Sequence, residues 1–451
     1  MTGTATEGIR RTPRIKMSGG DRKVVAATMV GTTIEWYDFF IYAQAAGLIF
    51  AQLYFSPLGS TGAQLASWAS LGISFLFRPL GAVVAGHLGD RVGRKAMLVL
   101  TLLMMGGATA LIGMLPTYAA IGIWAPILLV LLRILQGFSA GGEWGGAALM
   151  SVEHAPLSRR GLFGAYPQIG VPVGLILASL VIFILRASLG TEAFLAWGWR
   201  VPFLLSVVLI VVGYAIRRAV AESPVFVEMA QRKNESSAPL GVLFRSHKRS
   251  VILTAVIFIG NNAAGYMVIA FFSSYATKTL KMDTAQVLLA ILLASLGWLI
   301  FTLYGGALSD WIGRVRTFQI GYAWIFVWMI PMFLLIDTRN IWIFGLAIFV
   351  LTIGLGLSYG PMSAMYAEMF PANVRYSGVS IGYALGAILG GAFAPLIADA
   401  LMTHFKWSPA VGIYIMALCV ISFIGASMVK ETKGALLGVA AREAAVTGRQ
   451  R

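Results

Sequence analysis

The chain has 451 residues, of which 58% are hydrophobic and only 12% are charged. Soluble domains usually carry about 25% charged residues, so a water-soluble globular protein with an ordinary surface is excluded. The formal net charge of +16 would suit a nucleic-acid-binding protein. However, the basic residues are divided among short segments between long apolar runs, and we expect no nucleic-acid partner.

Long apolar segments follow one another along the chain. A helix needs about 20 apolar residues to cross a bilayer, and about twelve segments reach this length. They are residues 24–50, 63–88, 96–115, 123–150, 161–186, 198–219, 250–276, 284–308, 316–336, 341–367, 376–401 and 409–429. The sequence therefore predicts an all-α membrane protein with twelve transmembrane helices.

The basic residues are unevenly distributed between the two sets of turns that alternate along these spans. Most of the 34 Lys and Arg residues fall in the two tails, the central loop and the turns on the same side. Lys and Arg accumulate in the cytoplasmic loops of membrane proteins. We therefore expect a multi-pass protein of the cell inner (plasma) membrane with both termini cytoplasmic. The basic central loop can also contact anionic lipid headgroups.

Two motifs recur in both halves of the chain. Residues 86–95 (GHLGDRVGRK) return in degraded form at 306–314, with glycine and aspartate displaced by 220 residues. A second motif, Glu-x-x-Pro-x-x-x-Arg, begins at Glu153 and again at Glu368, 215 residues later. Each copy has the same place among the spans. Repeats in parallel order predict two pseudo-symmetric six-helix bundles related by an axis along the membrane normal.

The repeats and the longest polar interruption divide the chain into five parts. We expect a cytoplasmic N-terminal tail (1–23), an N-terminal six-helix bundle (24–219), a cytoplasmic central loop (220–249), a C-terminal six-helix bundle (250–429) and a cytoplasmic C-terminal tail (430–451).

The first repeated motif predicts a gate on the cytoplasmic side. Asp90 ends the second span, where its carboxylate can accept hydrogen bonds from arginines or from a helix N-terminus. Arg91 and Arg94 follow at the membrane edge, and the cluster can hold the two halves together and release them. Asp310 and Arg314 form the second copy, from which we expect less because the first arginine is not repeated. A loop that only sets membrane topology is the alternative.

Polar residues follow helical spacing in three N-terminal spans. The sets are Gly31, Glu35, Asp38 and Tyr42 in the first span, Ser67, Ser70, Ser74 and Arg78 in the second, and Arg133, Gln136, Ala140 and Glu143 in the fourth. Residues three and four apart share a helix face. Since a charged side chain facing lipid is costly, we expect the three stripes to line one aqueous cavity.

Two carboxylates and two arginines in these stripes predict the chemistry. Burial favours a protonated carboxyl group and a nearby arginine favours a carboxylate, so such a group can take up and release a proton. We assign proton coupling to Asp38, with Glu35 as partner or substitute. We assign binding of a substrate carboxylate to Arg133 and Arg78. Ion pairing of Arg133 with Asp38 or Glu143 is an alternative, as is snorkelling or backbone bonding of Arg78.

Further polar residues complete the expected substrate site. They are Tyr42, Gln136 and Glu143 in the N-terminal half, and Asn261, Asn262 and Tyr266 in the seventh span. Glu143 lies among glycines that favour close helix packing, so a structural role is its alternative. Hydrogen bonding between helices is the alternative for the asparagines and the tyrosine.

Together these motifs resemble the major facilitator superfamily over essentially the whole chain. Residues 86–95 are similar to its loop between helices 2 and 3, residues 133–137 (RILQG) to its helix 4 motif and residues 222–224 (ESP) to its signal after helix 6. A narrower resemblance is to the metabolite:H+ symporter family of osmoprotectant, shikimate, α-ketoglutarate and citrate permeases. It is carried by residues 34–40 (IEWYDFF), 77–81 (FRPLG) and 136–146 (QGFSAGGEWGG).

The resemblance implies a symporter that imports a small organic metabolite with protons by alternating access. The arginines favour a carboxylate or a zwitterion. The expected partners are the metabolite, H+ and the lipid bilayer, and a monomer is expected to suffice. Two alternatives stay open: a proton-coupled exporter of drug-like compounds and a transporter-like nutrient receptor. We expect no enzyme, no cofactor and no metal site, because nucleotide-binding, metal-ligand and nucleophile motifs are not recognisable.

Overall fold

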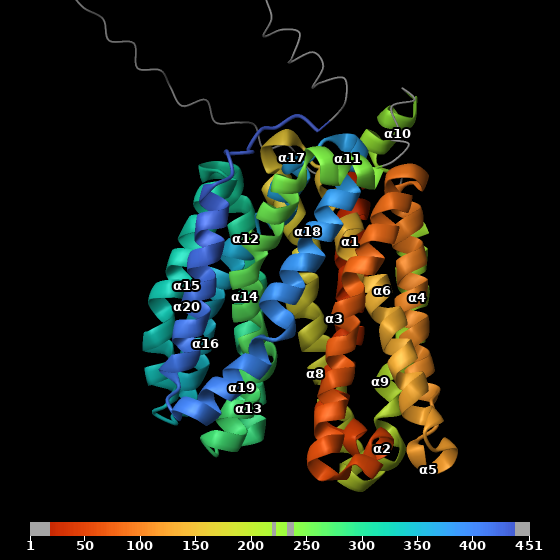
Figure 1. Ribbon diagram of the computed structural model, residues 1–451, viewed down its shortest axis with the longest axis vertical. Coiled ribbons are helices and arrows are strands. Elements are labelled where there is room, and N and C mark those ends of the chain that lie inside the picture. The colour runs from red at the N-terminus through yellow and green to blue at the C-terminus, as the bar shows by residue number, and fades with distance from the viewer. Residues whose placement is uncertain (1–18, 219–221, 232–238, 438–451) are drawn as a thin grey trace, which may run out of the picture.

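The computed structural model describes residues 19–218, 222–231 and 239–437. This part of the chain is helical, without strands, and forms two bundles that stand side by side (Figure 1). The first bundle contains α1 (Gly19–Ala45), α2 (Ala51–Tyr54), α3 (Gly59–Val92), α4 (Arg94–Met114), α5 (Tyr118–Ile121), α6 (Trp124–Glu153), α7 (Arg160–Gln168), α8 (Gly170–Ala193) and α9 (Arg200–Arg218). The second contains α12 (Lys248–Tyr266), α13 (Phe272–Ser274), α14 (Thr284–Ile312), α15 (Arg314–Ile336), α16 (Ile341–Tyr359), α17 (Met362–Met369), α18 (Arg375–Ala387), α19 (Ala394–Phe405) and α20 (Pro409–Ser427).

The helices are long enough to span a bilayer. Eleven of the described helical segments have the length and apolar composition of membrane spans. α1 has a comparable length of 27 residues, and its apolar run is interrupted by Glu35 and Asp38. With α1 as the twelfth span, the expected all-α fold of two six-helix bundles is confirmed.

The distribution of side chains is that of a protein surrounded by lipid. Large apolar side chains face outward along the helices, for example Val211 (62% exposed) and Val327 (71%). Charged side chains such as Asp38 and Arg133 are fully buried inside the bundles. A charged group is costly in hydrocarbon, whereas an apolar side chain is not. The charged groups that could bind a ligand or a proton therefore lie in the interior of the bundles.

The bundles meet along a small set of helices. α18 of the second bundle packs against α3 and α6, and α7 of the first packs against α14 and α17. Within the first bundle, a Cβ atom on Gly137 would lie 2.1 Å from the backbone oxygen of Ser74, and one on Gly141 would lie 2.0 Å from that of Arg78. The glycines of α6 thus allow it to approach α3 closely, which confirms the packing role predicted for them.

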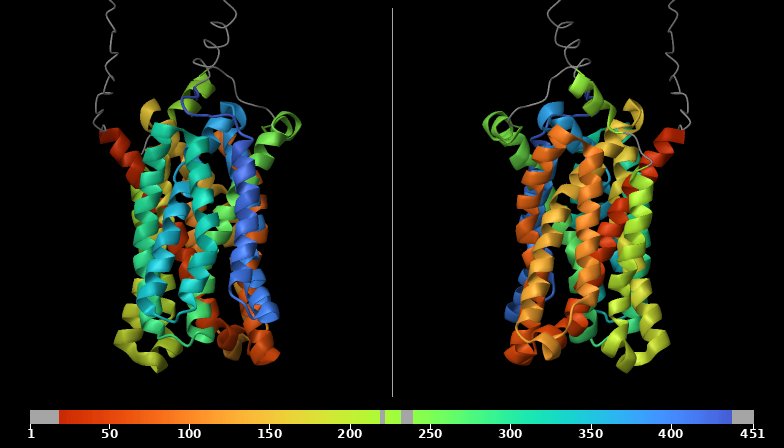
Figure 2. Two further views of the ribbon diagram at one scale, coloured as in Figure 1. Left: turned by 90° about the vertical axis from the view of Figure 1, so that its left-hand side faces the viewer. Right: turned by 90° about the vertical axis from the view of Figure 1, so that its right-hand side faces the viewer.

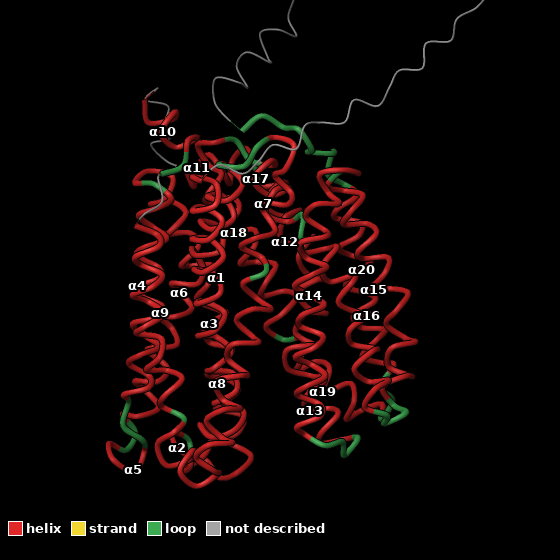
Figure 3. The backbone as a smooth tube through the Cα atoms, turned by 180° about the vertical axis from the view of Figure 1, so that it is seen from behind, coloured by secondary structure: helices red, strands yellow, loops and turns green. Residues whose placement is uncertain are grey.

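Both ends of the described chain lie at one end of the molecule, which we call the termini face (Figure 2). The short helices α2, α5, α13 and α19 lie at the other end (Figure 3). The connection between the bundles also crosses the termini face and contains α10 (Pro224–Gln231) and α11 (Pro239–Ser246). The sequence predicted only a polar loop at 220–249, because two helices of eight residues each leave little periodicity to recognise.

The repeated gate motif folds as two helices joined by one glycine. α3 continues to Val92 and α14 to Ile312, so both gate aspartates lie in the last turns of helices. Gly93 (φ 121°) and Gly313 (φ 104°) then reverse the chain into the next helix. Such positive φ values are readily adopted only by glycine. The two copies of the motif therefore share the same tight turn.

Candidate functional site

A small cavity lies between the two bundles. The first bundle contributes Trp36 of α1 and Val171 of α8. The second bundle contributes the remaining wall residues, namely Phe258, Asn261, Asn262, Gly265, Tyr266, Ile269, Trp298, Tyr359 and Tyr383. The cavity has about 20 Å³ of space for the centre of a water molecule. Its walls are mainly aromatic, with amide and hydroxyl groups between the rings.

A stack of aromatic rings joins the bundles beside this cavity. Trp144 of α6 stacks on Tyr383 of α18 with ring centroids 3.7 Å apart, and Tyr383 stacks on Phe258 at 4.4 Å. The indole of Trp144 donates to Gln168 Oε1 (2.6 Å), and Gln168 Nε2 donates to the backbone oxygen of Tyr359 (3.2 Å). Stacking and hydrogen bonds therefore connect α6 and α7 to α16 and α18 at the level of the cavity.

Asp38 is fully buried in the first bundle. Its Oδ1 accepts a hydrogen bond from the hydroxyl of Ser206 on α9 (2.5 Å). Its Oδ2 has no hydrogen-bond partner among the described residues, and Thr109 of α4 lies beside the carboxylate. One oxygen of Asp38 is thus bonded, and the other has no partner in the part of the chain that the structure describes.

Arg133 is also fully buried and is held by neutral groups. Its guanidinium donates to Gln136 Oε1 (2.6 Å) and Ser74 Oγ (2.7 Å) and lies 3.8 Å from the ring centre of Tyr42. Gln136 in turn donates to Thr109 (2.7 Å). Within the described chain no carboxylate lies within 4 Å of Arg133, so the alternative of an ion pair with Asp38 or Glu143 is not realised.

Arg78 lies among aromatic rings. Its guanidinium carbon is 4.4 Å from the ring centre of Phe75 and 5.4 Å from that of Phe39. The side chain is buried, which excludes the snorkelling alternative. In the described part of the chain, Nε of Arg78 and Oε2 of the buried Glu35 both lack a hydrogen-bond partner. Aromatic faces stabilise a cation but leave its donors available to an anion.

Glu143 is occupied by an ion pair. Arg217 at the end of α9 donates to both of its carboxylate oxygens, and the hydroxyl of Thr101 donates to Oε2 (2.5 Å). The pair supports the structural alternative for Glu143 over substrate binding. Sequence reasoning missed Arg217, which was counted only among the basic residues of the central loop.

Asn261, Asn262 and Tyr266 all line the cavity. The amide nitrogen of Asn261 donates to the backbone oxygen of Leu355 (3.0 Å), and that of Asn262 donates to Ala387 (3.0 Å). Both asparagines therefore link helices as well as facing the cavity. The Tyr266 hydroxyl has no partner among the described residues.

The gate motif of the first half connects the two bundles. The Asp90 carboxylate accepts hydrogen bonds from the backbone N–H groups of Tyr376 (3.2 Å) and Ser377 (3.1 Å) and from the Ser377 hydroxyl (2.8 Å). These amides lie at the start of α18, where a helix offers unpaired N–H groups and a favourable dipole. Arg91 lies exposed at the end of α3.

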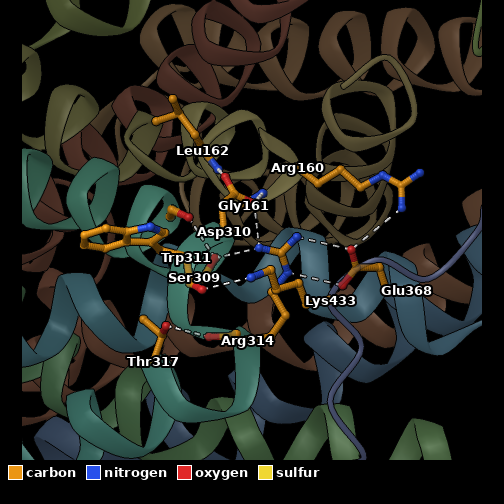
Figure 4. A network of polar contacts seen from close by, with 12 residues as sticks. Arg160, Gly161, Leu162, Ser309, Asp310, Trp311, Arg314, Thr317, Glu368 and Lys433 are labelled. Carbon is orange, nitrogen blue, oxygen red and sulfur yellow. Dashed lines mark hydrogen bonds and ion pairs between the residues drawn. The ribbon is translucent and has the colours of Figure 1, made fainter. Parts of the chain in front are cut away.

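The second copy makes the reciprocal contact (Figure 4). The Asp310 carboxylate accepts from the backbone N–H groups of Gly161 (2.7 Å) and Leu162 (2.9 Å) at the start of α7. Arg314 donates to the same carboxylate (2.7 Å) and forms an ion pair with Glu368 (3.2 Å). The second copy is therefore as fully bonded as the first, contrary to the weaker role expected from its incomplete sequence.

Two further acidic residues complete the network. Glu153 accepts from Arg375 (2.9 Å) and lies 3.6 Å from Arg94. Glu368 occupies the equivalent place beside Arg314 and Arg160. These residues start the second repeated motif, so both sequence repeats converge in one polar layer at the termini face. The sequence predicted the repeats but not this convergence.

The structure also contains a third repeat, at Glu222 and Glu431, which was not recognised from the sequence. The Glu222 carboxylate accepts from the backbone N–H of Arg94 (3.2 Å) and of Lys95 (3.1 Å) at the start of α4. Glu431 accepts from Arg314 (2.9 Å) and Val315 (3.2 Å) at the start of α15. The neighbouring hydroxyls agree as well, because Ser223 donates to Glu153 and Thr432 donates to Glu368. The pairs Glu222-Ser223 and Glu431-Thr432, 209 residues apart, were the available signal.

The segment after α20 crosses between the bundles. The backbone oxygen of Ala435 accepts a hydrogen bond from Arg160 of the first bundle, and that of Leu437 accepts one from Arg375 (3.0 Å). Leu437 itself is buried. Residues expected to form a plain tail are thus part of the polar layer.

Comparison with known proteins identifies relatives over almost the whole chain. The sequence matches the family profile described as Major Facilitator Superfamily over residues 28–395. It is 40% identical to the inner membrane metabolite transport protein YhjE of Escherichia coli, covering 91% of this chain and 94% of that protein. It is 37% identical to the shikimate transporter of Escherichia coli (92% and 95% covered) and 35% identical to a putative proline/betaine transporter of Staphylococcus aureus (89% and 87%).

Solved structures share the fold. The proton:xylose symporter XylE, bound to 6-bromo-6-deoxy-D-glucose, superposes with a TM-score of 0.75 at 18% identity, covering 93% of this chain and 98% of that one. A double tryptophan mutant of XylE gives a TM-score of 0.77 at 17% identity, with coverages of 92% and 97%. At this level of identity the likeness concerns the fold alone.

Proposed function

The chain belongs to the major facilitator superfamily, and from this membership we propose that it imports a small carboxylate-bearing metabolite together with protons. It is a multi-pass metabolite transporter rather than an enzyme. In the proposed cycle the two bundles rock about the central cavity, so that the cavity opens to one side of the membrane at a time.

The observation that carries the proposal is the state of the buried charges beside the cavity. Arg133 and Arg78 are buried and have no carboxylate within ion-pair distance in the described chain. A buried cation without a counter-ion is costly unless a ligand supplies the charge. An arginine can bind a carboxylate through two parallel hydrogen bonds. The names of the relatives support this class, because shikimate, proline and betaine all contain a carboxylate.

Proton coupling is assigned to Asp38, with Glu35 as its partner. Each carboxyl group is buried and has one oxygen without a partner in the described chain. Arg133 is bonded to Gln136 and Gln136 to Thr109, which lies beside Asp38. This chain of polar groups connects the proposed substrate site with the carboxylate of Asp38. Protonation of Asp38 would remove a negative charge near Arg133 and so favour the binding of an anion. Substrate and proton would then enter together.

The polar layer at the termini face is the proposed cytoplasmic gate. Asp90 and Asp310 each bind the start of a helix in the opposite bundle, so opening this face requires both contacts to break. The basic loops predict that this face is cytoplasmic. The relative YhjE is named as an inner membrane protein, which supports the same location for this chain.

Uptake by purified protein in proteoliposomes tests the proposal. A pH gradient, acidic outside, should drive accumulation of a carboxylate such as shikimate above its external concentration. Asp38→Asn should reduce this accumulation to the level of protein-free vesicles, because an amide cannot carry the proton. Exchange of labelled for unlabelled substrate should persist.

Asp283→Asn is the matched control. Asp283 caps α14 through Gln286 (2.9 Å) on the face opposite the termini, and asparagine caps a helix about as well as aspartate. Full uphill uptake by Asp38→Asn would reject the assignment to this residue. If uptake by the unmodified protein did not depend on the pH gradient, proton coupling itself would be rejected.

A further inference from the structure

Two hydrogen-bond donors in the cavity wall have no partner in the described chain. They are Nε1 of Trp298 on α14 and the hydroxyl of Tyr266 on α12. Trp298 is 3% exposed and Tyr266 is 6% exposed, so neither group is satisfied by bulk solvent. Buried donors of this kind are nearly always bonded. Their position on the cavity indicates that a ligand is the missing partner.

Other donors that the second bundle contributes to the wall are bonded within the protein. The hydroxyl groups of Tyr359 and Tyr383 contact each other (3.3 Å). The amide nitrogens of Asn261 and Asn262 bond to helix backbone. Trp298 and Tyr266 therefore differ from the neighbouring donors of the second bundle, which have partners within the protein.

The two donors lie on different sides of the cavity. The ring of Tyr266 contacts Phe75 (centroids 5.7 Å apart) and Phe39 (6.4 Å), the two rings closest to the guanidinium of Arg78. Trp298 lies farther into the second bundle, where the centroid of its ring is 6.4 Å from that of Tyr359. Its ring also packs on Gly265, because a Cβ atom added to that glycine would lie 3.0 Å from the indole. A ligand held by Arg78 would have Tyr266 near its charged end and Trp298 toward its other end.

The chemistry of these donors restricts the ligand. An indole N–H only donates, so its partner must be an acceptor oxygen or nitrogen. A tyrosine hydroxyl can donate to the same group or to a neighbouring oxygen. An alkyl chain has no acceptor, and a quaternary ammonium group has none either. Both would leave the donors unpaired on binding.

We propose that the substrate is a hydroxy or oxo acid. Its carboxylate binds the arginines, its uncharged oxygen accepts a hydrogen bond from Trp298, and Tyr266, nearer the charged end, donates to the same oxygen or to a neighbouring one. This assignment rests on the proposed uptake of carboxylates and adds the second recognition element. Trp298 and Tyr266 are then the residues that select hydroxylated or keto compounds over simple alkyl acids and over quaternary ammonium zwitterions. A site built to bond an oxygen discriminates strongly against analogues that lack it.

The test is binding to purified protein by a matched set of compounds of two sizes. The small set is propionate, 2-hydroxypropionate and 2-oxopropionate. The large set is cyclohexanecarboxylate with its 3-hydroxy and 3-oxo derivatives. Trimethylammonioacetate represents the quaternary zwitterions. In at least one of the two sets, the hydroxy or oxo acid should bind about tenfold tighter than the parent acid. This gain is expected when a buried donor acquires a hydrogen-bond partner on binding.

Trp298→Phe should reduce this selectivity ratio to within about twofold, and Tyr266→Phe should lower it in part. Trp328→Phe is the control, because the indole of Trp328 is bonded to the backbone oxygen of Ala347 (2.9 Å) and Trp328 is not a cavity residue. The ratio is measured within one variant, so partial loss of folded protein does not change it.

Each outcome separates the two proposals. If carboxylates bind but parent acids bind as tightly as their oxygenated derivatives, the inference fails and the proposed function stands. The inference also fails if trimethylammonioacetate binds tightest, or if Trp298→Phe weakens all compounds equally. If no carboxylate of either size binds, the proposed substrate class fails as well.

Discussion

The two bundles share one fold but differ in the groups that they bring to the centre. The first bundle contributes buried charges: Asp38, Glu35, Arg78 and Arg133. The second contributes most of the cavity wall, with aromatic rings, two asparagine amides and the hydroxyl and indole donors. The comparison shows that the two halves of a duplicated scaffold carry different groups at the centre, which under our proposal divides proton coupling from recognition of the uncharged part of the substrate.

The termini face shows the opposite behaviour. There the main contacts of the acidic residues correspond between the two halves. Asp90 and Asp310 accept from the backbone at helix starts, as do Glu222 and Glu431, and Glu153 and Glu368 lie beside equivalent arginines. A gate that must open and close both bundles together needs matched contacts, whereas a substrate is not symmetric. The layer that we propose as the gate has therefore kept the repeat, and the centre has lost it.

The largest effect is expected from the charged half. Arg133→Lys keeps the positive charge but loses the planar group that bonds a carboxylate at two points. Carboxylate binding should weaken about 10- to 100-fold, while selectivity between hydroxy and alkyl acids should not change. Arg186→Lys, at an exposed position, is the control. Equal loss of affinity and selectivity would mean that the division between the bundles is wrong.

A smaller effect is expected from the two copies of the proposed gate, and it can be measured as hydrogen exchange at individual backbone amides. Asp90→Asn should speed hydrogen exchange at Tyr376 and Ser377 about tenfold, because the bond to a charged acceptor is weakened. Asp310→Asn should do the same at Gly161 and Leu162. Exchange measured by mass spectrometry of the purified protein checks both. If only the first substitution had an effect, the gate would be asymmetric.

The smallest effect is expected at the third repeat. Glu222→Gln and Glu431→Gln each remove a charged acceptor from the start of a helix, which should cost about 1 kcal/mol of stability. The two substitutions should lower the thermal unfolding temperature by similar amounts in detergent. A loss confined to Glu222→Gln would show that the segment after α20 contributes little to the polar layer.

The fold was largely predictable, because hydropathy and repeats are local properties of the sequence. Each predicted span corresponds to a helix or to a continuous pair of helices, and the offset of the gate motif gave the two halves. The two stripes that contain Asp38 and Arg133 followed from helical spacing alone. What the pattern could not give is which partner each charge meets across the bundle.

Partner choice depends on packing between distant segments. Glu143 and Arg217 are 74 residues apart, and nothing in either local sequence identifies the other. Trp298 looked like any other aromatic residue in an apolar span, and only its place on the cavity distinguishes it. The groups that the second bundle brings to the cavity carry no charge, so the charge pattern of the sequence does not distinguish them from other residues of the spans.

The most direct test compares Asp38→Asn with Trp298→Phe in the same proteoliposomes, using pH-gradient-driven uptake of the best-bound hydroxy acid and of its unsubstituted parent. We predict that Asp38→Asn abolishes uphill uptake of both compounds without altering their relative affinity. We predict that Trp298→Phe keeps proton-driven uptake and loses the preference for the hydroxy acid. If Trp298→Phe uncouples transport from the pH gradient, or if Asp38→Asn changes selectivity, the two bundles do not divide the tasks as proposed.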